Sequence, residues 1–429
     1  MKSKVTRRAF FGVGVAAASA AAVGGGLAMT HATHVVAVVD QGLAPLDAVG
    51  PMEVLARLPD AKGIYASQAG GSVRVARGPL TLHDTDPLSS VARADVIVLA
   101  GGAQRPGPDA IAWLRSAEAK ARLVLAAGDG ARWLETAGIK RDGRRVVATA
   151  GGAAAIDAAL AGAALLENET YAKALQLGIE YDPAPPFRID EAAEVEPGGI
   201  APLSVAILLY EGMTALDAIG PYEVLSRVPN VAITLIGPGT APINTDTGDL
   251  FLGVDRDFGG AGPFDLVVVP GGSVGTLQAA RNDRLLEWLA AQTQVKSTRV
   301  MSICTGALIL GGTGILAGKK ATTHWASEAS LVELGAQFVH ERFVANGNIV
   351  TAAGVSAGID VALAIVGELR GRALGAAIQR ALPYDPRPPF DMGALPKASP
   401  QVIDAANAEL TSNAIGSLAR MALRRRPTV

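Results

Sequence analysis

The chain of 429 residues contains a single cysteine, Cys304, and its sequence context favours a reactive thiol. The apolar residues 298–303 before it predict a central strand, and Thr305 and Gly306 lead into a predicted helix. A nucleophile at a sharp strand-to-helix turn is held clear of the sheet. Because free amides at a helix start favour a thiolate, we expect the pKa of Cys304 to lie below that of a free thiol. The alternative is a buried, inert cysteine, which composition alone would favour.

Three further features are expected beside Cys304, because open α/β sheets bind ligands at the carboxyl ends of their strands. Asp217 follows a predicted strand and is a candidate catalytic carboxyl, with helix capping as its alternative. Gly271 and Gly272 follow another strand; their amides could hold a developing negative charge, or they could form a simple turn. His324 lies twenty residues beyond the cysteine and is expected to support the site without acting as its base.

Composition excludes several classes of partner. Hydrophobic residues make up 49% of the chain and charged residues 18%, with a formal net charge of −2. No basic face is evident in the body of the chain, so nucleic acid is not an expected partner. Five histidines and one cysteine suggest no metal-ligand cluster, so we expect no metal and no cofactor. A small molecule is the expected partner of the site.

The sequence repeats itself, and the repeat predicts the architecture. Each half begins with an apolar β-branched run and a Leu-Asp-Ala turn, and each ends in a Tyr-Asp-Pro-x-Pro-Pro-Phe segment. Strands that alternate with helices predict two tandem flavodoxin-like doubly wound α/β domains with mainly parallel sheets. The expected units are a signal peptide, a first domain, a linker, a second domain and a helical tail, at residues 1–33, 34–190, 191–201, 202–393 and 394–429.

The two halves are unequal at the predicted site. Gly128 stands 176 residues before Cys304, at the equivalent place in the first half. Asp157 and Asp360 are equivalent at an offset of 203, so the first half lacks 203 − 176 = 27 residues between these points. The counterpart of His324 falls in the missing stretch.

The first half therefore keeps Asp47, the counterpart of Asp217, but has no nucleophile. We expect it to be a structural partner, so that the tandem forms an intramolecular pseudo-dimer. A ligand-sensing pocket in the first half is the alternative, and association into a homo-oligomer stays open.

Residues 202–393 resemble the isonitrile hydratase-like members of the PfpI (DJ-one) family, within the class I glutamine amidotransferase-like superfamily. The matching pieces occur in order along the domain: Leu216-Asp217-x-x-Gly220-Pro221, Pro270-Gly271-Gly272, Ile303-Cys304-Thr305-Gly306, Ala321-Thr322-Thr323-His324-Trp325-Ala326, Val339-His340-Glu341-Arg342, Ala357-Gly358-Ile359-Asp360 and Pro386-x-Pro388-Pro389-Phe390. The resemblance implies that Cys304 is the nucleophile, that Asp217 contacts it and that Thr305 lies in the site.

The resemblance also implies a function. We expect a Cys-dependent hydratase or hydrolase of a small carbon–nitrogen compound, with conversion of an isonitrile to an N-substituted formamide as the leading case. PfpI proteases carry a histidine directly after the cysteine, and Thr305 occupies that place here, which argues against a Cys-His protease. The alternatives are a non-catalytic thiol-based sensing or ligand-binding module and an amidase or peptidase.

The first residues predict export. Basic residues that include Arg7 and Arg8 precede a weakly apolar stretch, residues 9–29, in the order typical of an export signal. The segment around Arg7 and Arg8 resembles the twin-arginine motif of bacterial Tat signals. The sequence therefore predicts a periplasmic protein, with an uncleaved membrane anchor as the alternative.

Overall fold

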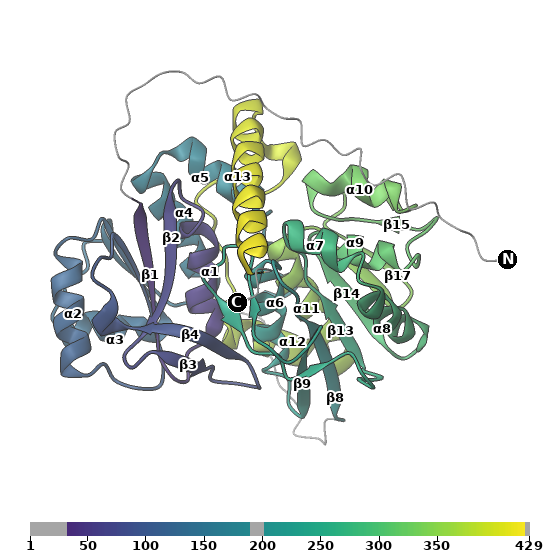
Figure 1. Ribbon diagram of the computed structural model, residues 1–429, viewed down its shortest axis with the longest axis horizontal. Helices are drawn as coiled ribbons and strands as arrows, with labels where there is room; N and C mark the ends of the chain where they lie inside the picture. The colour runs from purple at the N-terminus through teal and green to yellow at the C-terminus, as the bar shows by residue number, and fades with distance from the viewer. Residues whose placement is uncertain (1–31, 189–200, 425–429) are drawn as a thin grey trace.

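The computed structural model describes residues 32–188 and 201–424, which form two α/β units side by side (Figure 1). The predicted signal peptide and linker lie almost wholly outside these residues. The first unit has a parallel sheet in the order β2-β1-β5-β6-β7. Its strands are β1 (Thr33–Val39), β2 (Ala61–Ser67), β5 (Val96–Gly101), β6 (Leu123–Ala127) and β7 (Val146–Thr149).

Both faces of this sheet are covered by helices, which explains the continuous apolar strands. Alternate residues of β1 point to opposite faces: Val35 belongs to one buried cluster and Val36 to the other. One face packs against α1 (Pro45–Leu55) and α4 (Ala153–Leu166), followed in the chain by α5 (Glu169–Gly178). The other packs against α2 (Pro108–Glu118) and α3 (Ala131–Ala137).

The second unit repeats the strand order, as β9-β8-β13-β14-β18. This is the 2-1-3-4-5 order of flavodoxin-like sheets, so the predicted fold class is confirmed. Its parallel strands are β8 (Leu203–Leu208), β9 (Val231–Gly237), β13 (Leu266–Val269), β14 (Arg299–Ile303) and β18 (Ile349–Ala352). The edges carry β12 (Arg256–Asp257) and the antiparallel β17 (Phe343–Asn346).

One hairpin crosses between the units. Strands β10 (Ile243–Asn244) and β11 (Phe251–Leu252) come from the second half, yet β11 pairs antiparallel with β4 (Thr81–Pro87) of the first. The edge of the first sheet, which also holds β3 (Gly71–Arg74), is thereby covered. The first sheet thus includes residues far beyond position 190, where the repeat alone ends the first domain.

The second half also contains an insertion between its elbow helix α9 (Gly306–Gly312) and β18. The inserted elements before β17 are β15 (Lys320–Ala321), α10 (Glu328–Glu333) and β16 (Gln337–Phe338). In the first half, α3 is followed directly by β7. The insertion therefore corresponds to the 27 residues that the first half lacks.

The two units contact each other through equivalent residues. Helices α1 and α6 (Ala215–Leu225) pack together. Glu53 on α1 accepts a hydrogen bond from the N–H of Leu216 at 3.4 Å, and Glu223 on α6 accepts one from the N–H of Leu46 at 3.1 Å. Each half thus binds the first turn of the other half's helix, as in an isologous dimer interface.

The end segments of the two halves are exchanged in the same reciprocal way. Gln176 Nε2 donates to the carbonyl of Phe390 at 2.8 Å, and Gln379 Nε2 donates to that of Phe187 at 2.7 Å. A second equivalent pair joins backbone N–H groups to carboxylates, Ala184 to Asp360 at 2.8 Å and Arg387 to Asp157 at 2.7 Å. These contacts involve α5 of the first half and, in the second, α11 (Val355–Arg370) and α12 (Arg372–Ala381).

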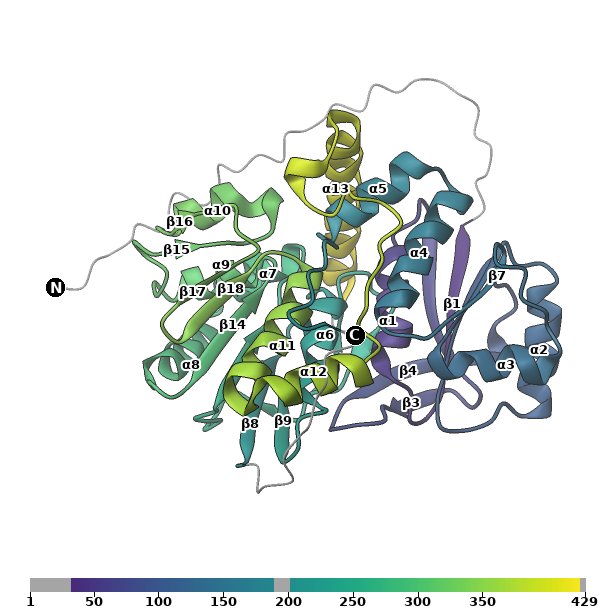
Figure 2. The same ribbon diagram turned by 180° about the vertical axis from the view of Figure 1, so that it is seen from behind.

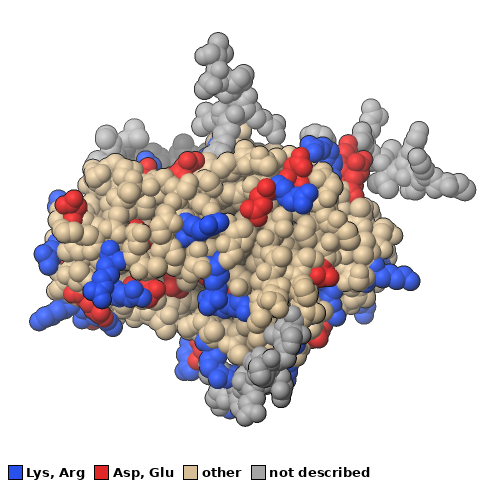
Figure 3. Space-filling view, turned by 90° about the horizontal axis from the view of Figure 1, so that it is seen from below, with Lys and Arg blue, Asp and Glu red and all other residues tan. Residues whose placement is uncertain are grey.

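The final helix, α13 (Pro400–Arg424), lies over the junction of the two units and packs against α5 (Figures 1 and 2). In the part of the chain that the structure describes, no helix is both long and apolar enough to cross a membrane. Charges of both signs are scattered over the face seen in Figure 3, with wide uncharged areas between them.

Candidate active site

Cys304 lies at the turn that the sequence predicts. It follows β14 directly and has a φ of +55°, a left-handed conformation that is strained for a residue with a side chain. Its N–H donates to the carbonyl of Ala352 at 3.0 Å, and its carbonyl accepts a hydrogen bond from Thr323 Oγ1 at 3.0 Å. These bonds on both sides hold the elbow, and the thiol is 9% exposed.

Asp217 lies beside the thiol, in the first turn of α6, and its side chain is fully buried. Its Oδ2 accepts a hydrogen bond from the N–H of Gly271 at 3.0 Å. The carboxyl is within hydrogen-bonding reach of Cys304. Burial, followed by the charge of Glu53, raises the pKa of Asp217 well above its usual range. Asp217 therefore faces the cysteine instead of capping its helix.

The expected direction of the thiol pKa is wrong. Burial raises the pKa of Cys304 well above its ordinary value, and the carboxylates of Asp217 and Glu180 raise it further. The N–H of Thr305 opposes this shift, but its effect is smaller. The helix start was expected to dominate, yet α9 has only seven residues, whereas two carboxylates lie close by.

The amides of Gly271 and Gly272 are not free. Gly271 donates to Asp217, as described, and Gly272 donates to Thr305 Oγ1 at 2.9 Å. Thr305 Oγ1 in turn donates to the carbonyl of Gly272 at 2.7 Å and lies 2.9 Å from Thr276 Oγ1. The two glycines therefore orient Asp217 and Thr305, and neither amide is left to receive a developing negative charge in this arrangement.

His324 is buried at the cavity wall and both of its ring nitrogens are occupied. Nε2 lies 2.9 Å from the carbonyl of Gly178, and Nδ1 accepts the N–H of Ala326 at 3.3 Å. These partners require the neutral tautomer with the proton on Nε2. Burial lowers the pKa of His324 to about 4, so the ring stays neutral at physiological pH. His324 supports the site by holding the first half against it.

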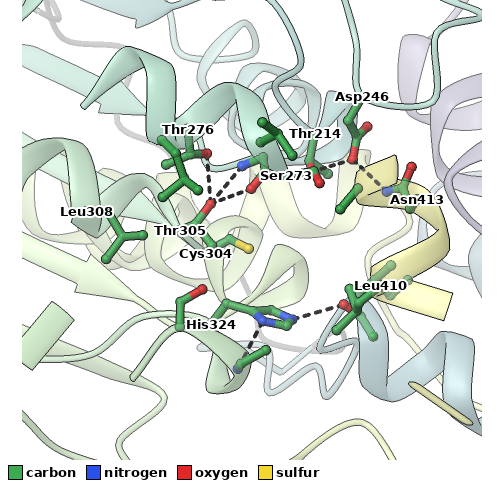
Figure 4. A pocket seen from close by; sticks show the side chains of 18 of the residues that line it. Thr214, Asp246, Ser273, Thr276, Cys304, Thr305, Leu308, His324, Leu410 and Asn413 are labelled. Atoms are coloured by element: carbon green, nitrogen blue, oxygen red, sulfur yellow. Dashed lines mark hydrogen bonds between the residues drawn. The ribbon is translucent and has the colours of Figure 1, made fainter. Parts of the chain in front are cut away.

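The thiol faces a cavity of about 250 Å³ (Figure 4). Helix α13 forms one wall through Leu410 and Asn413, and the first half contributes Gly178 and Ile179. The apolar lining consists of Ile179, Val274, Leu277, Leu308, Val355 and Leu410. The repeat predicts a self-sufficient second domain, and the structure shows that the first half and the tail complete its cavity.

The polar end of this cavity is built around Arg57 of the first half. Its guanidinium binds Asp246 of the crossing hairpin at 2.9 Å, Glu409 of α13 at 3.5 Å and Glu53 on its own helix. Asp246 also accepts hydrogen bonds from Thr214 and Asn413. The cluster joins three separate parts of the chain. Its members lie far apart in the sequence, and no motif marks them.

The equivalent place in the first half has lost the geometry as well as the cysteine. Asp47 Oδ1 accepts the N–H of Gly152 at 2.6 Å. A Cβ built on Gly128 would lie 2.2 Å from Asp47 Oδ2. The carboxyl therefore occupies the space that a side chain at the elbow would need. A cavity of about 400 Å³ adjoins it, bounded on the second half's side by Glu223, Arg227 and residues 381–383.

Within residues 32–188 and 201–424, no group of three or more His, Cys, Asp or Glu side chains is arranged to hold a metal ion.

Comparison with known proteins agrees with this geometry. The DJ-1/PfpI family profile matches residues 203–368. Over 205 residues, 48% of this chain, the sequence is 39% identical to isonitrile hydratase of Pseudomonas putida and covers 88% of it. The Parkinson disease protein 7 homolog of Danio rerio is 27% identical over 41% of this chain and 94% of its own length. A solved ThiJ/PfpI family protein from Pseudomonas syringae is 30% identical, with a TM-score of 0.48, over 54% of this chain and 99% of its own. The chain belongs to the DJ-1/PfpI family.

Proposed function

We propose that the protein hydrates an isonitrile to the N-substituted formamide, with Cys304 as the nucleophile. The observation that carries the proposal is the protonation state of the site. Burial keeps the thiol of Cys304 and the carboxyl of Asp217 protonated at neutral pH. This suits a substrate whose reacting carbon must gain a proton as well as a bond to sulfur.

The first step adds the S–H group across the terminal carbon of the isonitrile. The C–S bond forms, the S–H bond breaks and its proton passes to the same carbon, which gives a thioimidate on Cys304. Asp217 lies within reach of the thiol and can carry this proton by giving one up and accepting the other. No external acid or oxidant is needed.

The second step adds water to the thioimidate. The water oxygen bonds to the carbon and one water proton goes to the nitrogen. The C–S bond then breaks, and the remaining hydroxyl proton returns to sulfur as the formamide leaves. Asp217, held by Gly271, is the group that can orient this water and move its protons.

The shape of the cavity supports a small substrate with an apolar substituent. Its volume of about 250 Å³ and its aliphatic lining suit one compact organic group. The similarity to isonitrile hydratase of Pseudomonas putida favours the same chemical class. A thiol sensor or a Cys-His protease is less well supported, because both depend on a thiol that ionises easily and this one is held protonated.

The direct test mixes the purified protein with an aryl isonitrile and follows formation of the formamide. The matched control is Cys304→Ser, which keeps the size of the side chain. Formamide production by the parent and not by the variant supports the proposal. If the parent hydrolyses an aryl amide or a peptide and leaves the isonitrile untouched, the hydratase assignment is wrong.

A further inference from the structure

The end segment of α5 delivers four consecutive backbone carbonyls of the first half to the second. Leu177 and Gly178 accept hydrogen bonds from Trp325 Nε1 at 3.1 Å and His324 Nε2 at 2.9 Å. The two carbonyls that follow, those of Ile179 and Glu180, accept from the Val355 N–H at 3.2 Å and from Ser356 Oγ at 3.0 Å. These bonds fix the position of Glu180 relative to the elbow of the other half.

Glu180 has several features that its packing alone does not explain. Its φ of +47° is left-handed, which is uncommon for a residue with a long side chain. Its Oε2 is buried and has no hydrogen-bond partner among the described residues. Asp217 and Arg342 of the second half and Asp182 of its own segment are the charged groups that act on it, and the backbone N–H of Trp325 stabilises its charged form. An unpaired buried carboxyl is costly, so its retention near Cys304 indicates a use.

The repeat supplies an internal comparison. Tyr181 and Tyr384 are equivalent at an offset of 203, so Pro383 occupies the place of Glu180 in the second half. The segment that contains Pro383 borders the cavity beside Gly128, where the nucleophile is missing. The carboxyl is therefore present in the segment that meets the cysteine and absent from the segment that meets the glycine.

We propose that Glu180, supplied by the first half, is a positioning residue for the second half: its negative charge keeps the proton on Cys304 until a substrate is bound. The inference rests on the proposed function, in which that proton is transferred to the substrate carbon. It gives the first half a chemical contribution to the site, in addition to its structural one.

The sign of the effect follows from the two groups. Burial raises the pKa of Glu180 to about 8, and the pKa of the thiol lies higher still. Glu180 is therefore ionised over the pH range in which the thiol loses its proton, and its charge opposes that loss. Removing the charge should make the thiolate form at lower pH.

The test measures alkylation of Cys304 by iodoacetamide from pH 7 to 11, in the full chain. In Glu180→Gln we expect the midpoint to move to lower pH and the rate at pH 8 to rise about 5- to 10-fold, from the loss of one nearby charge. Glu180→Asp retains the charge and should stay within about twofold of the parent. Asp182→Asn is the matched control: it removes a carboxylate of the same segment, which pairs with Lys397 at 2.7 Å, and should leave the rate nearly unchanged.

The outcomes separate this inference from the proposed function. A Glu180→Gln midpoint equal to the parent's, or an equal change in Glu180→Asp, would overturn the positioning role, because only the charge differs between the two variants. Turnover of the aryl isonitrile by the parent alongside that result would leave the proposed function intact. A shifted midpoint in a protein that never converts the isonitrile would support the role of Glu180 and reject the hydratase.

Discussion

Replacing Asp47 with asparagine should stabilise the protein above neutral pH and leave its stability near pH 4 unchanged. Asp47 is only 7% exposed, and burial is the largest cause that raises its pKa from 3.8 to about 7. The carboxylates of Glu223 and Asp129 raise it as well, whereas the N–H of Gly152 and the charge of Arg227 lower it. Asparagine keeps an acceptor for the N–H group and cannot ionise.

The sign and size of the effect follow from the two pKa values. A carboxyl whose pKa is raised on folding contributes stability below its unfolded value, and this contribution is lost as the pH rises through the folded value. The difference between 3.8 and about 7 corresponds to ~4 kcal/mol at ~1.4 kcal/mol per pH unit. Because the carboxyl borders an open cavity, relaxation and solvent will reduce this number, and we expect roughly 2–4 kcal/mol at pH 8.

The measurement is urea unfolding of the parent and Asp47→Asn at pH 4, 6 and 8. The difference in free energy of unfolding should be near zero at pH 4 and should grow through pH 6 to its full value at pH 8. Asp404→Asn on the surface of α13 is the control, since an exposed carboxyl should give a small difference at every pH. A difference between the parent and Asp47→Asn that does not change with pH would show that Asp47 ionises normally, and the reasoning would be refuted.

Three further predictions concern activity and export. Cys304→Ser should abolish formamide production, with a urea midpoint close to the parent's; activity above a few per cent would exclude a covalent mechanism. Asp217→Asn should lower turnover about 100-fold or more, as expected for a lost proton-transfer group, while Asp47→Asn should remain within about threefold; equal losses would assign both carboxyls to one site. Replacing Arg7 and Arg8 together with lysine should leave the protein in the cytoplasm on cell fractionation, and export at the parent's level would exclude the twin-arginine route.

The fold could be predicted from the sequence because it is repeated and locally encoded. Apolar runs such as residues 35–39 are buried on both faces, so they predict a parallel sheet covered by helices. The elbow at Cys304 was predictable for the same reason, because its strand, turn and helix are consecutive. The crossing hairpin at residues 243–252 was not, since an edge pairing between distant strands leaves no periodic signal.

The electrostatics of the site were not predictable from the elbow alone. The expected thiol pKa relied on the helix that follows Cys304, which is a local feature. The observed direction depends on burial and on two carboxyls, Asp217 from 87 residues earlier and Glu180 from the other half. The repeated Tyr-Asp-Pro segment was visible in the sequence, but its neighbour Glu180 gained meaning only when the exchanged end segments placed it at the site.

Linking two halves in one chain changes what each half must retain. In an isologous dimer of identical chains, every copy must carry both the nucleophile and the end segment that completes its partner's site. In this chain the two parts are divided: the second half holds Cys304, and the first half holds the segment that ends in Glu180. Gly128 and Pro383 then lie together at the other site, where neither a thiol nor that carboxyl is present. The loss of the first nucleophile is therefore compatible with a first half that the remaining site still needs.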